Sequence, residues 1–391
     1  MKILIAHNNY GKYSGEEAVV DGMVSMLEAM GHDVAQLRMT TEGLQDSATG
    51  KMRAFFAGIY SPAGIRAMRE ALEREKPDIV NIHNLYPFIS PAALRECHRH
   101  GIPVVMTIHN FRLICPTGLF MRDNAPCEHC LKAGNEWGCI RYNCEHSRLK
   151  SVGYALRNMA ARWRGDYKKH VTRFACITAF QRRKLIEAGF DSDRIEVIPN
   201  SIHLNSQFPI PDSQFNYVAY SGRISKEKGV DMIINVARRH PEMEFRLAGA
   251  VRDEELVEDL PGNVRLMGYM TGEALADFYR GARFFVMASR WYEGFPMTIL
   301  EAGSHGKAMV GPDHGGFTEI IGRGDDAIGM LTLPGDVDSL EKAIVKMWAT
   351  PGLAEELGQK ARCAVEARYS TPVIADQWSR LLEELKKCHE E

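Results

Sequence analysis

The strongest constraint on the fold is a rhythm that runs along almost all of the 391 residues. Short apolar, β-branched runs alternate with segments of helical periodicity. In the first half, strands are expected at 2–6, 34–38, 77–82, 102–108, 173–178 and 195–198, and helices at 17–30, 63–75 and 91–100. Strands that alternate with helices predict βαβ units and a parallel sheet covered by helices on both faces.

A second series of the same kind begins at residue 217. Its strands are expected at 217–220, 245–248, 264–267, 283–287, 309–310 and 329–332. The polar, proline-containing segment 205–216 lies between the two series and is interpreted as a linker. A chain this long is unlikely to build one core. We therefore predict an α/β protein of two doubly wound, Rossmann-like domains, 1–205 and 206–371, facing each other across a cleft. A C-terminal helix, 372–391, is expected to pack back on the first domain.

Composition places the chain among ordinary globular proteins, with 45% hydrophobic and 25% charged residues. A formal net charge of -2 gives no general attraction to nucleic acid, so no nucleic-acid partner is expected. The first apolar run is too short for a signal peptide, and no run is long enough to span a bilayer. A cytoplasmic protein is expected.

The most informative segment is Tyr292–Glu301, which follows an apolar strand and opens a helix. Free backbone N–H groups at the start of a helix, together with its dipole, make a seat for phosphate or sugar hydroxyls. These groups would belong to Phe295, Met297 and Thr298, while Pro296 suits the first turn. Glu293 and Glu301 could hold two diols, one on a sugar and one on a ribose. The alternative is a capping carboxylate beside a solvated one.

This E-x7-E segment resembles that of the family 4 retaining glycosyltransferases, and other segments resemble their pattern in the same order. They are the turn Ser14–Glu17, the strand end at His109–Asn110, the turn 197–201, the basic segment Ser221–Gly229, the loop Gly268–Met270 and the turn Gly315–Glu319. The chain departs from the family pattern where Ser14 and Ala250 replace glycines and Ala308 replaces a proline.

The resemblance implies a GT-B fold and transfer of a sugar, with retention, from a UDP- or GDP-sugar to a glycan or lipid-linked acceptor. Cell-surface polysaccharide or glycoconjugate synthesis would be the setting, and no catalytic metal is expected. Arg223 and Lys228 would neutralise the diphosphate. His109 would lie beneath the sugar, Glu293 would orient it and Glu301 would hold the ribose. The remaining donor contacts would come from Gly15, Gly268, Tyr269, Met270, Gly294, Phe295, Pro296, Met297 and Thr298.

Other functions compete with this interpretation. A catalytically idle GT-B scaffold or a nucleotide-sugar epimerase remains open. A nicotinamide oxidoreductase is disfavoured because no G-x-G-x-x-G follows the first strand. The D-x-D triplets at 191–193 and 336–338 lie at polar turns beside helices, so capping explains them better than a metal.

Five of the nine cysteines fall within residues 115–144, in a segment without clean periodicity that we interpret as an insertion, 115–147. Cys127 and Cys130 form a C-x-x-C pair, and Cys115 and Cys144 could complete a structural zinc site of four thiolates. Cys139 or His146 could substitute for one of them. Reduced thiols and disulfides are the alternatives.

Residues 148–173 carry a strong basic bias. Eight cations face one acid, Asp166, and the cations are Arg148, Lys150, Arg157, Arg162, Arg164, Lys168, Lys169 and Arg173. Leu149 and Trp163 are interleaved with them. A basic amphipathic stretch of this kind predicts contact with an anionic membrane, peripheral at its inner face, and a lipid-linked acceptor. The alternative is a solvated helix face.

Overall fold

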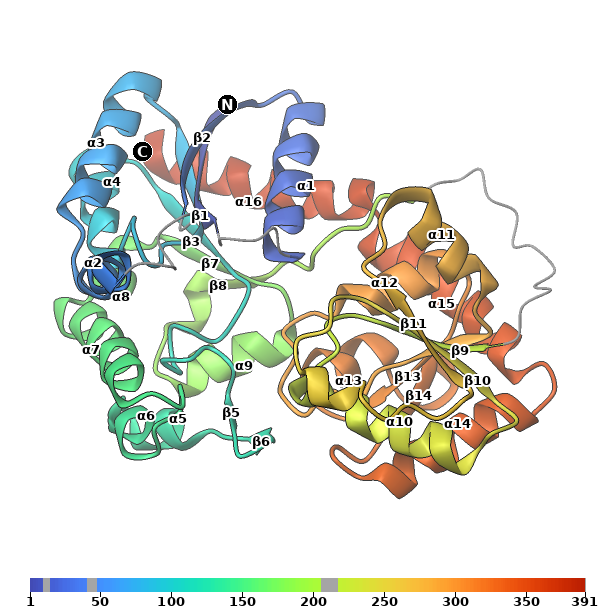
Figure 1. Ribbon diagram of the computed structural model, residues 1–391. Coiled ribbons are helices and arrows are strands. Elements are labelled where there is room, and N and C mark those ends of the chain that lie inside the picture. Colours follow the sequence, from blue (N-terminus) through green and yellow to red (C-terminus); the bar gives the residue numbers. More distant parts are fainter. Residues whose placement is uncertain (10–14, 41–47, 205–216, 391) are drawn as a thin grey trace. The chain divides into compact units, whose positions relative to one another are not determined.

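The computed structural model describes residues 1–9, 15–40, 48–204 and 217–390 (Figure 1). The expected linker 205–216 and Ser14 lie outside these residues. The chain divides into two compact units, the first comprising Met1–Phe120, Glu128–Ser201 and Ile374–Glu391. The second unit comprises Met121–Cys127 and Ile202–Val373.

The first unit is built on a six-stranded sheet of order β2-β1-β3-β4-β7-β8, with every pair parallel. The strands are β1 (Lys2–Asn9), β2 (Asp33–Thr40), β3 (Ile79–Asn84), β4 (Val104–Ile108), β7 (Arg173–Cys176) and β8 (Ile195–Val197). The central strands are buried on both faces, which explains their continuous apolar runs. The strands predicted for this half are confirmed, with boundaries shifted by a few residues.

The first unit also contains helices. They are α1 (Gly15–Ala29), α2 (Ala48–Ile59), α3 (Pro62–Glu75), α4 (Leu94–Arg99), α5 (His129–Ala133), α6 (Trp137–Arg141), α7 (Arg148–Arg164), α8 (Asp166–His170) and α9 (Ala179–Glu187). The start of α3 shows how sequence sets such a boundary. Pro62 takes the first helical position, and the Ser61 side chain accepts a hydrogen bond from the Gly64 N–H at 3.0 Å.

The segment 115–147 is not irregular throughout. It holds a two-stranded hairpin, β5 (Met121–Arg122) with β6 (Ala125–Pro126), and the helices α5 and α6. These elements are two to five residues long, too short for a hydrophobic period to be visible in the sequence.

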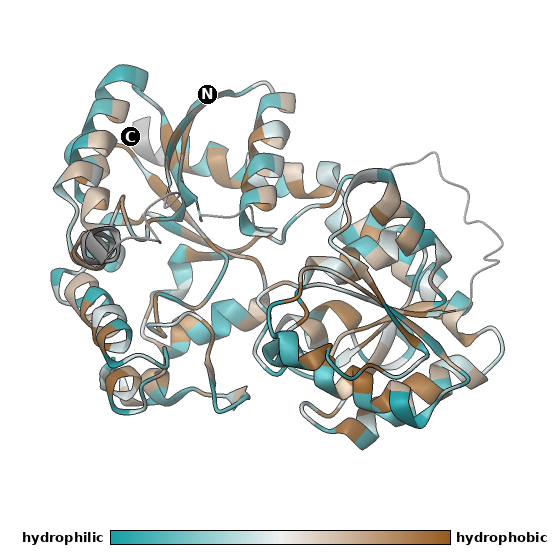
Figure 2. Cartoon of the chain, in the orientation of Figure 1, coloured by the Kyte–Doolittle hydropathy of each residue, from teal (hydrophilic) through white to brown (hydrophobic). Residues whose placement is uncertain are grey.

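The second unit repeats the plan with a parallel sheet of order β11-β10-β9-β12-β13-β14. Its strands are β9 (Tyr217–Ser221), β10 (Glu244–Ala248), β11 (Val264–Gly268), β12 (Phe284–Val286), β13 (Met309–Pro312) and β14 (Gly329–Thr332). Its helices are α10 (Val230–Arg239), α11 (Gly272–Gly281), α12 (Met297–Ser304), α13 (Gly315–Ile321), α14 (Val337–Ala349) and α15 (Leu353–Tyr369). In Figure 2, hydrophobic residues concentrate along the strands of the sheets.

The last helix, α16 (Thr371–Glu390), enters the core of the first unit. Its buried residues recur at helical spacing on one face and are Ile374, Trp378, Leu381, Leu382 and Leu385. They share a cluster with Ile3, Ile5 and Val20, and Trp378 is almost fully buried. Truncating such a tryptophan to alanine typically costs about 3–5 kcal/mol.

No helix among the described residues is both long and apolar enough to cross a membrane.

Candidate functional site

The topology of the second sheet indicates where a ligand would bind. Its strand order reverses between β9 and β12, and ligands of open α/β sheets bind outside the carboxyl ends of the strands at such a switch point. The loops that follow these two strands carry Arg223, Lys228 and Glu293. The structure therefore gathers the E-x7-E and basic segments at one edge of one sheet.

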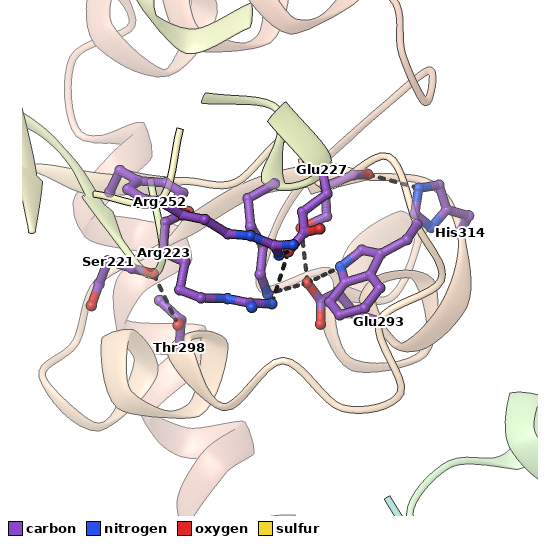
Figure 3. A network of polar contacts seen from close by, with 11 residues as sticks. Ser221, Arg223, Glu227, Arg252, Glu293, Thr298 and His314 are labelled. Carbon is purple, nitrogen blue, oxygen red and sulfur yellow. Dashed lines mark hydrogen bonds and ion pairs between the residues drawn. The ribbon is translucent and has the colours of Figure 1, made fainter. Parts of the chain in front are cut away.

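Glu293 is held by three donors on a single oxygen (Figure 3). Its Oε1 accepts hydrogen bonds from Lys228 Nζ at 2.5 Å, Trp291 Nε1 at 2.6 Å and Ser289 Oγ at 2.9 Å. Burial alone would raise the pKa of Glu293, but the Lys228 ammonium and these hydrogen bonds hold it below its usual value. Glu293 is therefore ionised at neutral pH and fixed in direction.

Arg223 points toward the same cluster, where it meets a second arginine (Figure 3). Arg223 Nη2 lies 2.9 Å from Glu227 Oε1, and Arg252 Nη1 lies 2.7 Å from the same oxygen. Sequence reasoning missed Arg252 and Glu227. Arg252 follows a different strand, β10, and no motif in the sequence couples it to the basic segment.

Glu301 lies on α12 and is paired with a tyrosine that the sequence analysis also missed. Tyr279 Oη donates to Glu301 Oε2 at 2.5 Å. Burial raises the pKa of Glu301, and the hydrogen bond from Tyr279 offsets part of that shift. Tyr279 itself is fixed by stacking on Phe285, with ring centres 4.5 Å apart, and on His305 at 5.5 Å.

The start of α12 differs slightly from the expectation. The helix begins at Met297, so Pro296 is the residue before it and not part of its first turn. Pro296 has an extended backbone, which suits the constraint of its ring. The first N–H groups of a helix have no intrahelical partner, so those of Met297 and Thr298 are suited to an anion or hydroxyl.

The glycine turn at the start of α13 holds the Glu293 loop in place. Gly316 N donates to Glu293 O at 2.8 Å, and a Cβ at Gly316 would lie 2.5 Å from Gly294 O. A larger residue would therefore displace the backbone that carries Glu293. The turn supports the site by this close approach.

Other residues of the predicted donor site lie at strand ends. Gly268 ends β11, and its carbonyl accepts from Gly249 N at 2.7 Å. Tyr269 follows and is strongly exposed, with Met270 beside it. Phe295 is buried against Tyr369, with ring centres 5.6 Å apart. Phe295 thus anchors the loop through its side chain.

The first unit carries the other two predicted residues, Gly15 at the start of α1 and His109 after β4. His109 Nε2 lies 2.8 Å from His83 Nδ1, and the two rings are stacked with centres 5.1 Å apart. Burial lowers the pKa of His109 to about 4, and burial together with the nearby His109 charge lowers that of His83 well below its usual value. The pair is therefore neutral at pH 7, and its hydrogen bond occupies the Nε2 atom of His109.

A small cavity of about 20 Å³ adjoins this histidine pair, with room for about one water. It is lined by residues that include Asn84, Tyr86, His109, Asn110 and Arg112. Arg112 Nη1 donates to Asn84 Oδ1 at 3.3 Å. Sequence reasoning missed His83, which lies near the end of β3, beside β4, while His109 directly follows β4.

Several thiols of the cysteine segment influence one another. The pKa of Cys139 is raised, first by a hydrogen bond with Cys144, then by burial and by the neighbouring Cys115 and Cys130. All five thiols are unbridged in the described residues, and no three His, Cys, Asp or Glu side chains there are arranged as a metal site. The zinc site and its predicted ligands, Cys115, Cys127, Cys130 and Cys144, stay a prediction.

Several cations of 148–173 have internal roles in the structure. Arg157 is buried and donates to Pro116 O at 2.7 Å, and Arg162 forms a bidentate pair with Glu136. Arg164 pairs with Asp166 at 2.8 Å, and Arg173 pairs with Glu384 at 2.6 Å. The expected basic face is thus reduced mainly to the first turn of α7 and the end of α8.

The interpretation of both D-x-D triplets as helix caps is confirmed. Asp191 Oδ1 accepts from Asp193 N at 3.1 Å, and Asp336 Oδ1 accepts from Ser339 N at 2.8 Å.

Comparisons with known proteins agree with this arrangement. Residues 13–206 match the family described as Glycosyltransferase Family 4, and residues 204–363 match Glycosyl transferases group 1. The chain is 23% identical over 251 residues to an alpha-galactosylglucosyldiacylglycerol synthase of Streptococcus pneumoniae, covering 58% of this chain and 65% of that protein. It is 30% identical over 236 residues to a mannosylfructose-phosphate synthase of Agrobacterium fabrum, covering 53% of this chain and 51% of that protein.

The chain thus spans between half and two thirds of the length of these two relatives. Among solved structures, the fold is similar to that of Anabaena HepE in complex with UDP and glucose. The TM-score is 0.67 at 17% identity, with 98% of this chain and 100% of that chain covered. The chain belongs to the family 4 glycosyltransferases and has their GT-B fold of two parallel-sheet α/β domains.

Proposed function

We propose that this protein transfers a sugar from a nucleoside diphosphate sugar to a glycan or lipid-linked acceptor, with retention of configuration. The observation that carries the proposal is the fixed, ionised Glu293, held by Lys228 at the same switch point as Arg223 and Glu301. This set offers two cations for a diphosphate and two carboxylates for diols. The similarity to an alpha-galactosylglucosyldiacylglycerol synthase and a mannosylfructose-phosphate synthase supports a sugar donor for this chain.

In the proposed reaction, the bond between the sugar C1 and the diphosphate oxygen breaks, and a bond from the acceptor oxygen to C1 forms on the same face. The acceptor hydroxyl gives its proton to the leaving phosphate oxygen. Lys228 and Arg223 stabilise the charge that develops on the diphosphate, which makes a metal ion unnecessary. Glu293 orients the sugar and Glu301 holds the ribose diol.

His109 is proposed to contact the donor sugar as a neutral group. Its Nε2 is engaged by His83, so Nδ1 is the nitrogen that can meet a sugar hydroxyl. The low pKa of His109 keeps the ring uncharged at neutral pH, which suits a hydrogen bond to a hydroxyl better than a proton transfer.

A ligand screen tests the donor site. We expect UDP or GDP, without added metal, to raise the melting temperature of the wild type, and Glu301→Ala and Arg223→Ala to lose most of that rise. Arg265→Ala is the matched control, because Arg265 pairs at the surface with Glu244. Failure of UDP, GDP, ADP and their sugars to shift folded wild type would contradict the proposal.

The acceptor side is proposed to rest on an anionic lipid surface through α7. Leu149, Leu156 and Trp163 recur every seven residues and form one stripe, whose two ends are 71% and 72% exposed. Arg164 Nη2 donates to Ile59 O at 3.0 Å, which ties the end of α2 to the end of α7. Tyr60, which follows α2, is also exposed.

Charge at the start of α7 supports this surface. Arg148 and Lys150 are exposed in its first turn, where the helix dipole disfavours cations. An external anion would offset that cost. We expect sedimentation with vesicles that contain anionic lipid, weaker sedimentation of Trp163→Ser, and no change for Leu333→Ser, a leucine of the second unit that is 63% exposed. Binding that ignores vesicle charge would rule the surface out.

A further inference from the structure

Two arginines from different loops share one carboxylate oxygen at the switch point of the second sheet. Arg223 Nη2 and Arg252 Nη1 lie 2.9 Å and 2.7 Å from Glu227 Oε1 (Figure 3). The side chains of Arg223 and Arg252 are 49% and 54% exposed, while that of Glu227 is 12% exposed. Two cations accessible to solvent thus converge on an anion that belongs to the protein.

The two loops are fixed to each other, so this convergence is built into the fold. Arg252 N donates to Ile224 O at 3.0 Å, and Asp253 Oδ2 accepts from Lys226 N at 2.7 Å. The loops approach so closely that a Cβ at Gly249 would lie 1.9 Å from Gly222 O. Gly249 also has a φ of 142°, which disfavours other residues. Arg252 therefore has a defined position relative to Arg223.

Glu227 is equally well anchored. Its carbonyl accepts from Arg290 N at 3.0 Å, and Arg290 Nη1 donates to the carbonyl of Lys226 at 2.6 Å. Glu227 directly precedes Lys228, the residue that holds Glu293. The carboxylate thus sits within the basic segment, between the two guanidinium groups and next to the ammonium.

We propose that Arg252 is a third cation of the diphosphate seat and that Glu227 is an internal counter-anion that pairs with both arginines until a diphosphate replaces it. This inference rests on the proposed function. Arg223, Lys228 and Arg252 contribute three positive charges, and Glu227 and Glu293 two negative ones, so the pairs leave a single positive charge before binding. Guanidinium groups bind phosphate oxygens in the planar, charge-assisted geometry that they use for carboxylates.

The competing interpretation is a surface ion pair without function. Exposed pairs contribute about 0–1 kcal/mol, and removal of Arg252 would then leave ligand binding unchanged. The two interpretations differ in which ligand is affected. A phosphate-binding arginine acts on a nucleoside diphosphate and not on the nucleoside, which carries no phosphate.

The test is calorimetric titration of the full chain with UDP, GDP, their nucleosides and inorganic pyrophosphate. For the nucleotide that binds, Arg252→Leu is expected to lower the affinity for the diphosphate about tenfold, as the loss of one charge-assisted contact would. The affinity for the nucleoside should not change. Glu227→Gln removes the competing charge and is expected to tighten diphosphate and pyrophosphate binding about threefold or more. Arg265→Leu, with a 67% exposed side chain, is the control and should match the wild type.

The outcomes separate the two proposals. If wild type binds a nucleoside diphosphate but Arg252→Leu binds it as the control does, the inference is wrong and the donor site stands. If Glu227→Gln lowers the affinity for the diphosphate, the carboxylate contributes to ligand binding and the counter-anion role is refuted. If wild type binds none of the probes, pyrophosphate included, both proposals fail. Circular dichroism of each variant shows whether a loss of binding reflects unfolding.

Discussion

Removal of the Tyr279 hydroxyl isolates the contact that supports Glu301. In Tyr279→Phe, the ring keeps its stacking on Phe285, but the carboxylate loses the 2.5 Å hydrogen bond. A hydrogen bond to a charged group contributes about 1.5–3 kcal/mol, so we expect a loss near 2 kcal/mol. For a domain of this size the melting temperature should fall by about 4–8 °C. Binding of the nucleotide should weaken as well, because Glu301 is no longer held in place.

A double-mutant cycle with Glu301→Gln provides the control, measured by thermal unfolding. In that background the partner is neutral, so Tyr279→Phe should cost about 1 kcal/mol. An equal loss in both backgrounds would falsify the charged hydrogen bond as the cause.

The pH dependence of Tyr279→Phe gives a second check. Burial raises the pKa of Glu301 above 4.5, so the folded state favours the protonated carboxyl. The contribution of Glu301 to the free energy of unfolding is therefore lost as pH rises through the folded pKa. Removing the hydroxyl raises that pKa further. The deficit of the variant should therefore be smallest at acid pH and grow as pH rises. A deficit that does not change with pH contradicts the reasoning.

Three further predictions follow from the same contacts. Lys228→Met leaves the buried Glu293 charge without its cation and should lower the free energy of unfolding by about 3 kcal/mol in denaturant titrations. Adding Glu293→Gln removes the unpaired charge and should restore part of this loss. The pKa values of His7 and His109 fall to about 4 from 6.5, so the unfolded chain takes up protons first as pH falls. The contribution of these two neutral histidines to the free energy of unfolding should thus be complete above pH 6.5. It should decline toward pH 4 by up to about 1.4 kcal/mol per pH unit for each histidine. His109→Asn should reduce this pH dependence in thermal melts. Metal analysis of protein prepared without chelator should find about one zinc per chain, which Cys130→Ser should lose because it removes one thiolate of the C-x-x-C pair; zinc-free wild type would dismiss the site.

The sequence was most informative where a single segment carries its own signal. The apolar runs of β1 and β3 are local, and parallel strands buried on both faces leave an unbroken pattern. The cap at Asp336 is likewise set by neighbouring residues. Strands, many helix boundaries and the loops with the binding residues could therefore be predicted.

What the sequence could not reveal depends on pairs that are distant in the chain. Tyr279 lies on α11 and Glu301 on α12, and the two helices follow different strands. Their side chains meet only in the folded structure, and no spacing in the sequence indicates that contact. His83 reaches His109 across neighbouring strands for the same reason. The arrangement of the thiols in the cysteine segment depends on how the short helices α5 and α6 fold, and these are too short to leave a hydrophobic period in the sequence.

The position of α16 has a consequence for how the chain can be made. The surface formed by Ile3, Ile5 and Val20 is synthesised early, but the helix that covers it emerges only after the whole second unit. At translation rates of about 5–20 residues per second, the chain from Val20 to Trp378 takes roughly 18–72 s to synthesise, and the surface waits that long for Trp378. The first unit is thus a nascent intermediate with an open apolar groove, and a helper protein that binds exposed apolar surface would find it there during synthesis.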